Sequence, residues 1–103
     1  MIHVVLTTFA NAEDAAKAVR TLVDEQIIAC GTILSGARSI YRWKDAIEDT
    51  EESVVLLKTS AERFPALEER LRAIHPYETP EIIALDPTAV SKDYADWVIG
   101  SVP

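Results

Sequence analysis

Residues 53–59 read Ser-Val-Val-Leu-Leu-Lys-Thr, a run in which a continuous apolar stretch precedes a single charge. Such a run predicts a strand that is apolar on both faces, because successive side chains of a strand point to opposite sides of the sheet. Residues 27–44 are also strand-like and are interrupted only at the turn-prone Ser35 and Gly36, where we expect a bulge or bend. The two segments should pair as a long hairpin, joined by the acidic residues 45–52.

On the N-terminal side of this hairpin, the pattern predicts one strand and one helix. Residues 2–9 are apolar and β-branched, as is typical of a strand. Asn11 is placed to cap a helix, with Asp14 three residues later. Apolar residues then repeat along one face of this helix, which predicts a buried stripe of Ala15, Val19, Leu22 and Val23.

A second helix follows the hairpin. Ser60 is a candidate N-cap, Pro65 is compatible with a first helical turn, and Pro76 ends the helical pattern. The expected buried stripe consists of Phe64, Leu67, Leu71 and Ile74.

The C-terminal quarter predicts one more strand and a last helix. Residues 81–85 read Glu-Ile-Ile-Ala-Leu, which favours a short buried strand that ends before Asp86 and Pro87. An amphipathic helix is expected after Ser91 or Asp93, with Tyr94, Trp97 and Val98 along it.

The order strand, helix, strand, strand, helix, strand is the split βαβ plan, in which both helices pack on one face of an antiparallel sheet. We therefore predict a single domain over residues 1–103 of the α+β class, a ferredoxin-like βαββαβ sheet with an additional C-terminal helix. The opposite face of that sheet is apolar too, which indicates a homo-oligomer with Tyr41 and Trp43 as interface anchors. The alternative is a monomer in which the last helix covers this face.

Composition narrows the function classes. The 103 residues carry a net charge of −7, which disfavours binding to nucleic acid and to anionic membrane surfaces. The chain has one cysteine, no apolar run of membrane-spanning length and no leader pattern at its start, so we expect a cytoplasmic protein. Phosphate-loop, dinucleotide and hydrolase motifs are absent and there are only two histidines, so we expect no enzymatic activity.

Several short motifs occur in a fixed order along nearly the whole chain: Ala29-Cys30, Ser39-x-Tyr41-x-Trp43, Glu52, Leu57-Lys58-Thr59, His75-Pro76-Tyr77-Glu78-Thr79-Pro80-Glu81 and Tyr94-x-x-Trp97. In this set the sequence resembles the CutA divalent-ion-tolerance family. The resemblance implies a ferredoxin-like subunit that assembles as a homotrimer, in which long hairpins wrap around neighbouring copies. It also implies a role in tolerance to copper and other divalent ions.

Three positions depart from the family pattern. Gly31-Thr32 follows Cys30 where the family usually has Val-Asn, and Lys44-Asp45-Ala46 replaces a turn that contains glycine. Thr7 and Thr8 stand where some relatives carry an additional cysteine, which argues against a thiolate copper site at that place.

The candidate metal ligands are His75, Glu78, Glu81 and Cys30. Imidazole and carboxylate suit copper or zinc, and an exposed thiol suits Cu(I), while no metal is needed for folding. The structural alternatives are a His75 ring that bonds the last carbonyls of the second helix, and a Cys30 that is a small buried hydrophobic residue. No local spacing encodes a complete site within one subunit, which leaves a site between subunits as the alternative.

Lys58 follows an apolar run, where its ammonium needs a partner or access to water. One interpretation is an ion pair with Glu81. The other is contact with a small anionic ligand in an intersubunit cleft, together with Tyr77 and Trp43. The functional alternatives are therefore a metal-associated tolerance protein, a regulatory module that binds an anion, and a scaffold without a ligand.

Overall fold

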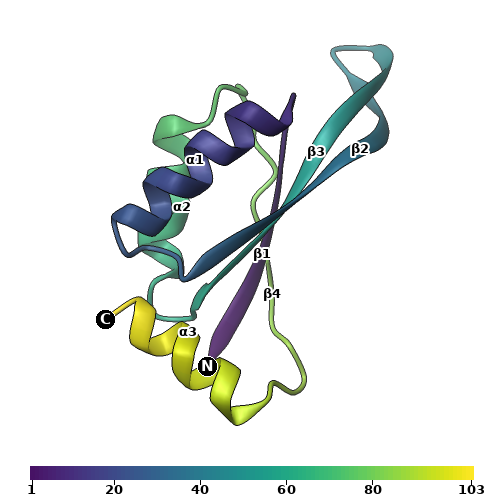
Figure 1. The fold of residues 1–103 in the computed structure, drawn as a ribbon. Helices are drawn as coiled ribbons and strands as arrows, with labels where there is room; N and C mark the ends of the chain where they lie inside the picture. Colours follow the sequence, from purple (N-terminus) through teal and green to yellow (C-terminus); the bar gives the residue numbers. More distant parts are fainter.

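The expected order of elements is confirmed in a computed structural model that describes residues 1–103 (Figure 1). The strands pair in the antiparallel order β2-β3-β1-β4. The elements are β1 (Ile2–Phe9), α1 (Ala12–Asp24), β2 (Cys30–Trp43), β3 (Ala46–Ser60), α2 (Phe64–Ile74), β4 (Ile83–Leu85) and α3 (Lys92–Ser101).

Helix α1 begins as predicted, because the Asn11 side chain accepts a hydrogen bond of 2.8 Å from the backbone N–H of Asp14. Its stripe is narrower than expected, since Ala15 and Leu22 are buried whereas Val23 is 41% exposed. One residue beyond Leu22 rotates the side chain by about 100° around the helix, away from the sheet. The prediction for Val23 is therefore wrong.

Helix α2 begins later than the sequence suggested. Ser60 is the last residue of β3, and its hydroxyl accepts a hydrogen bond of 3.1 Å from the backbone N–H of Arg63. The helix itself starts at Phe64, with Pro65 in its first turn as predicted. Ser60 thus stabilises the connection that leads into the helix and is not its cap.

The core lies between the sheet and the two helices, which pack on the same face (Figure 1). Val5 and Leu57 are directly paired across β1 and β3, and both side chains are almost fully buried. Helices α1 and α2 contribute the side chains that pack against this pair, Leu22, Leu67 and Leu71, which are also fully buried. Burial of this one cluster is the main source of stability in a domain of this size.

The hairpin is longer and tighter than expected. β3 begins at Ala46, so most of the acidic segment is strand and the predicted acidic connection is wrong. The turn consists of Lys44 and Asp45 alone, with φ of 50° and 67°. A two-residue hairpin turn needs positive φ at both positions, because this matches the twist of the strands. The predicted irregularity is confirmed between Leu34 and Ala37, where Gly36 has a φ of 81°.

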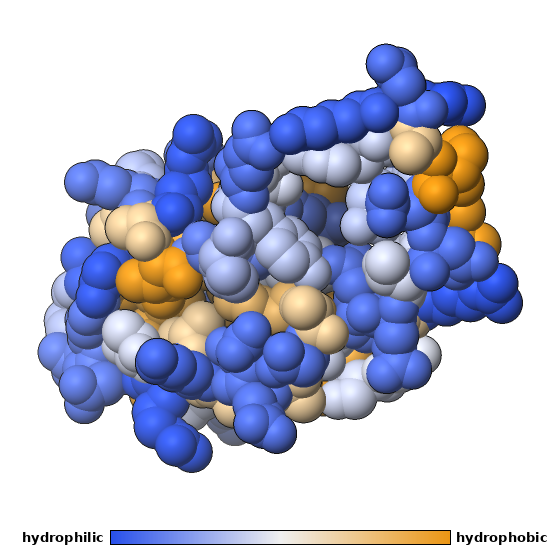
Figure 2. Space-filling model, turned by 90° about the horizontal axis from the view of Figure 1, so that it is seen from above, coloured by the Kyte–Doolittle hydropathy of each residue, from blue (hydrophilic) through white to orange (hydrophobic).

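The face of the sheet opposite α1 and α2 remains largely uncovered. Helix α3 covers only one end of this face, where Val98 meets Ile2 and Ala29, and leaves the rest of it open (Figure 1). On β4, Ile83 and Leu85 are 48% and 45% exposed, so the expected burial of this strand does not occur within one subunit. Figure 2 shows hydrophobic side chains exposed at two separate places among mostly hydrophilic ones.

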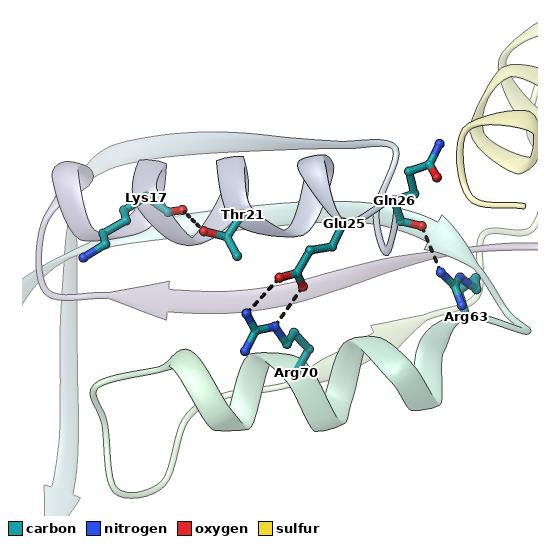
Figure 3. A network of polar contacts seen from close by, with 6 residues as sticks. All are labelled: Lys17, Thr21, Glu25, Gln26, Arg63 and Arg70. Atoms are coloured by element: carbon teal, nitrogen blue, oxygen red, sulfur yellow. Dashed lines mark hydrogen bonds and ion pairs between the residues drawn. The ribbon is translucent and has the colours of Figure 1, made fainter.

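Polar contacts hold the two helices together on the outside (Figure 3). Arg70 of α2 donates two hydrogen bonds of 2.8 Å to the two carboxylate oxygens of Glu25, the residue that ends α1. Arg63 donates a further bond of 3.2 Å to the backbone carbonyl of Gln26. The two helices are therefore joined where α1 ends.

None of the three helices has the length and apolar character needed to cross a membrane.

Gly31 provides the close approach of α1 to the sheet. A Cβ atom added at this position would lie 2.8 Å from Cγ1 and 2.9 Å from Cγ2 of Val19. The branched side chain of Val19 cannot swing aside easily, because its one rotatable bond is restricted in a helix. Glycine after Cys30 therefore allows tight packing at this point of the sheet.

We predict that Gly31→Ala lowers the free energy of unfolding by about 1–3 kcal/mol, because the added methyl group overpacks the contact with Val19. Guanidinium unfolding measures the change. Val19→Ala in the same chain should recover part of the loss. Gly100→Ala is the control, since a Cβ there meets no atom within 4 Å and alanine stabilises a helix. Equal stability of Gly31→Ala and the unmodified protein would contradict the packing argument.

Candidate functional site

The segment after α2 is fixed to the sheet by His75. Its Nδ1 accepts a hydrogen bond of 3.1 Å from the backbone N–H of Tyr77, so the proton of the neutral ring lies on Nε2. Nε2 then donates to the backbone carbonyl of Thr8 at 2.7 Å. The ring also stacks on Phe9, with 4.2 Å between the ring centroids. Its partner is therefore a carbonyl of β1, and not the carbonyls at the end of α2 that the sequence suggested.

The surroundings of His75 favour its neutral form. Burial lowers the pKa of the imidazole below its ordinary value of 6.5. The hydrogen bond to Thr8 and the charge of Glu52 oppose this shift without cancelling it. Since both ring nitrogens have partners within the subunit, His75 is a structural contact in this arrangement.

Tyr77 makes a second attachment. Its hydroxyl donates a hydrogen bond of 2.7 Å to Oε2 of Glu52, whose side chain is buried in the middle of β3. Burial raises the pKa of Tyr77 well above its ordinary value, and the hydrogen bond and charge of Glu52 add to this effect. The hydroxyl thus stays protonated and keeps donating to the carboxylate.

The carboxylates proposed as metal ligands are on the outside of this segment. Glu78 is exposed, and its Oε2 lies 3.5 Å from Nζ of Lys44 at the hairpin turn. Glu81 is also exposed. Cys30 is half-buried at the start of β2, where its Sγ lies 3.5 Å from the hydroxyl of Tyr94.

No cluster of three or more His, Cys, Asp or Glu side chains with metal-site geometry occurs within the subunit. The four predicted ligands are therefore not gathered in one chain, and metal binding by them stays a prediction.

Of the three residues expected in a ligand cleft, Lys58 and Trp43 are far apart within one subunit. Lys58 lies opposite Cys30 and donates a hydrogen bond of 3.0 Å to the hydroxyl of Thr32. The expected ion pair with Glu81 does not form. Trp43 is paired with Ala46 at the hairpin turn, which is roughly 40 Å along β3 from Lys58 at the usual rise per residue.

A groove of about 410 Å³ lies on the helix layer instead. It contains none of the predicted site residues and is lined by Phe9, Asp14, Lys17, Ala18, Thr21, Arg70, Ile74 and Pro76.

Sequence reasoning missed the partners of the predicted residues, namely Thr8, Glu52 and Tyr94. Glu52 and Tyr94 belong to the ordered motifs of the sequence, but these motifs do not show which side chains they contact. Thr8 takes part through its backbone, which leaves no trace in the sequence.

We predict that His75 makes the stability of the protein depend on pH. Because the folded-state pKa lies below 6.5, protonation is harder in the folded than in the unfolded chain. The contribution of His75 is therefore fully present above about pH 6.5 and is lost as the pH falls below that value. Denaturant midpoints between about pH 7.5 and pH 5 should fall more steeply in the unmodified protein than in His75→Gln. Parallel pH profiles would contradict this assignment.

Comparisons with known proteins agree with this fold. Residues 3–101 match the family model described as CutA1 divalent ion tolerance protein. A divalent-cation tolerance protein CutA from Thermus thermophilus is 41% identical over 98 residues, which cover 95% of each chain. The CutA of Pyrococcus horikoshii is also 41% identical, over 93% of each chain.

A solved structure from Archaeoglobus fulgidus, described as the periplasmic divalent cation tolerance protein CutA, superposes with a TM-score of 0.96. It covers all of both chains at 27% identity. The family match, the shared fold and the ordered motifs together show that this chain belongs to the CutA divalent-cation tolerance family.

Proposed function

We propose that the protein acts in divalent-cation tolerance as a non-catalytic homotrimer, with copper among the ions concerned. The observation that supports assembly is the uncovered apolar face of the sheet. At the far end of the hairpin, Tyr41 and Trp43 are large aromatic residues that remain 42% and 39% exposed. Exposed aromatic side chains of this kind are typical interface anchors.

The size of this face supports the same conclusion. Strand β1, the residues of β3 paired with it, the five residues of β2 beside them and the short β4 give a face of roughly 400 Å², from the usual strand spacing and rise. A monomer seldom exposes a larger contiguous apolar patch, and the hairpin adds to this area. Figure 1 shows that the hairpin extends away from both helices, and most side chains of residues 38–51 are exposed within the subunit.

A neighbouring copy would bury the same patch on every subunit through symmetric association. The number of copies comes from the resemblance to CutA, for which long hairpins that wrap around neighbours imply a trimer.

For the divalent ion, we infer two separate contact places. One is the exposed pair of carboxylates, Glu78 and Glu81, and the other is the thiol of Cys30. Oxygen donors suit Cu²⁺ or Zn²⁺, whereas sulfur suits Cu⁺. Each place would need further ligands from another copy. His75 could join the carboxylates only by releasing the carbonyl of Thr8.

We also propose a cytoplasmic location, because a single half-buried thiol suits a reducing compartment. The relative from Archaeoglobus fulgidus, in contrast, is described as periplasmic.

A second function, binding of a small anionic ligand, is favoured by one observation. Lys58 is a half-buried cation that forms no ion pair.

We predict that light scattering after size exclusion gives a mass three times that of the 11.4 kDa chain. Replacing both Tyr41 and Trp43 by alanine should shift the population toward smaller species, because these anchors supply much of the buried interface. Lys92→Met is the matched control, since Lys92 pairs with Asp96 on the exposed side of α3. A single 11.4 kDa species at micromolar concentration would refute the assembly.

Native mass spectrometry with copper tests the ion contacts. We predict that the double variant Glu78→Gln, Glu81→Gln lowers the Cu²⁺ stoichiometry, because carboxamides are much weaker ligands than carboxylates. Cys30→Ser should lower the Cu⁺ stoichiometry alone. Lys92→Met should change neither. Loss of Cu²⁺ in His75→Ala as well would show that the ring leaves Thr8 to become a ligand. Copper binding that is equal in all these variants would remove the four residues from the site.

A further inference from the structure

Lys58 occupies an unusual position on the open face of the sheet. The register places one row of side chains across all four strands, in the order Cys30, Lys58, Val4 and Leu85. The adjacent row on the same face contains Thr32, Leu56, Leu6 and Ile83. Lys58 is the one charged residue in these two rows. Its ammonium is therefore set in apolar surroundings, where electrostatic interactions are stronger than in water.

No carboxylate neutralises this ammonium. The four ion pairs of the subunit involve Arg38, Lys44, Arg70 and Lys92, and the only side-chain hydrogen bond of Lys58 goes to the hydroxyl of Thr32. An ammonium has three N–H donors, so two remain for another partner. Since Thr32 accepts from Lys58, its own hydroxyl proton is also free to donate.

A third donor comes from α3. The hydroxyl of Tyr94 lies 3.5 Å from Sγ of Cys30, and Cys30 is directly opposite Lys58 in the register. Side chains at directly opposed positions of an antiparallel pair lie side by side, with Cβ atoms about 5 Å apart. The hydrogen bond with Cys30 and burial raise the pKa of Tyr94 to about 12, so its hydroxyl keeps its proton at neutral pH. Sulfur is a weak acceptor, so this proton can turn from Sγ of Cys30 to a stronger acceptor such as an oxyanion. An ammonium and two hydroxyls are thus gathered at one end of the open face.

We propose that Lys58, Thr32 and Tyr94 form a binding site for a small free oxyanion, a carboxylate or a phosphate. The donors are in excess of acceptors here, and the oxygens of such an anion accept several hydrogen bonds at once. This inference rests on the proposed assembly, because a second copy that covers the open face removes water from Lys58. An unpaired buried charge is costly, so an anion that pairs with it is bound more strongly once the face is covered.

The alternative source of the same chemistry is a carboxylate side chain from the neighbouring copy. The experiment must therefore separate a free anion from a partner residue. NMR signals of the four lysine side chains, labelled with ¹³C at Cε, report the ammonium groups one by one in the assembled protein. Sodium phosphate and sodium acetate are the probes, and sodium chloride at equal ionic strength is the reference.

We expect the Lys58 signal alone to shift saturably with phosphate or acetate, and not with chloride. Tyr94→Phe and Thr32→Val should weaken the binding by about tenfold each, since each removes one hydrogen bond to a charged group. Lys58→Met keeps the aliphatic stem and should abolish the thermal stabilisation that phosphate gives. Lys92→Met, on the exposed side of α3, should retain that stabilisation in full.

Two results would overturn the proposal. Parallel shifts of all four lysines would show only a general effect of salt. An unresponsive Lys58 signal, with Lys58→Met dissociating the assembly, would assign the partner to a carboxylate of the neighbouring copy. The mass of each sample, measured by light scattering, keeps the two hypotheses apart. A trimer with an unresponsive Lys58 refutes the anion site alone, whereas a monomer refutes the assembly on which the site rests.

Discussion

The structure depends on one constraint: a sheet that is apolar on both faces has only two helices to cover it. Val5 and Leu57 face the helices and are buried in the core. Their neighbours in sequence, Val4 and Leu56, lie on the opposite face of the sheet and are half-buried. The alternation of a strand makes this division unavoidable once consecutive residues are all apolar. The short fourth strand and the terminal helix protect only the margins of the second face. The chain itself thus leaves part of its apolar surface exposed, and this exposed surface is the basis of the proposed assembly.

The most distinctive motif of the sequence has a structural explanation of its own. The segment from His75 to Glu81 connects the second helix to an edge strand of only three residues, which pairs weakly by itself. A stacked imidazole and a phenol attach it to two different strands, through the carbonyl of Thr8 and the carboxylate of Glu52. Neutral imidazole and protonated phenol are the forms that make these bonds. A histidine beside carboxylates suggested metal chemistry, but within one subunit these side chains hold the chain in place.

Much of the fold was accessible from the sequence, because it follows from local patterns. The period of the apolar residues identified both core helices, and Asn11 and Pro65 located their first turns. The acidic residues of β3 were misassigned, since charge is no obstacle to a strand when both of its faces meet solvent. The site was harder to predict. Lys58 forms a hydrogen bond with Thr32 and no ion pair with Glu81, and Glu52 accepts a hydrogen bond from Tyr77. Such pairings depend on strand register and on the path of a connecting segment. Side-chain partners that are distant in sequence leave no periodic signal.

The two-residue turn at Lys44 and Asp45 limits how the hairpin of this protein can vary. Both positions already adopt left-handed backbone conformations, so the tip of the hairpin has no slack to absorb an extra residue. An insertion of a single residue in either arm would exchange inward and outward side chains beyond that point, unless a new bulge corrected it. Evolution can therefore lengthen or shorten this hairpin most readily by two residues in each strand at a time. The reach of the arm, and with it the spacing of subunits in any assembly, would then change in discrete increments.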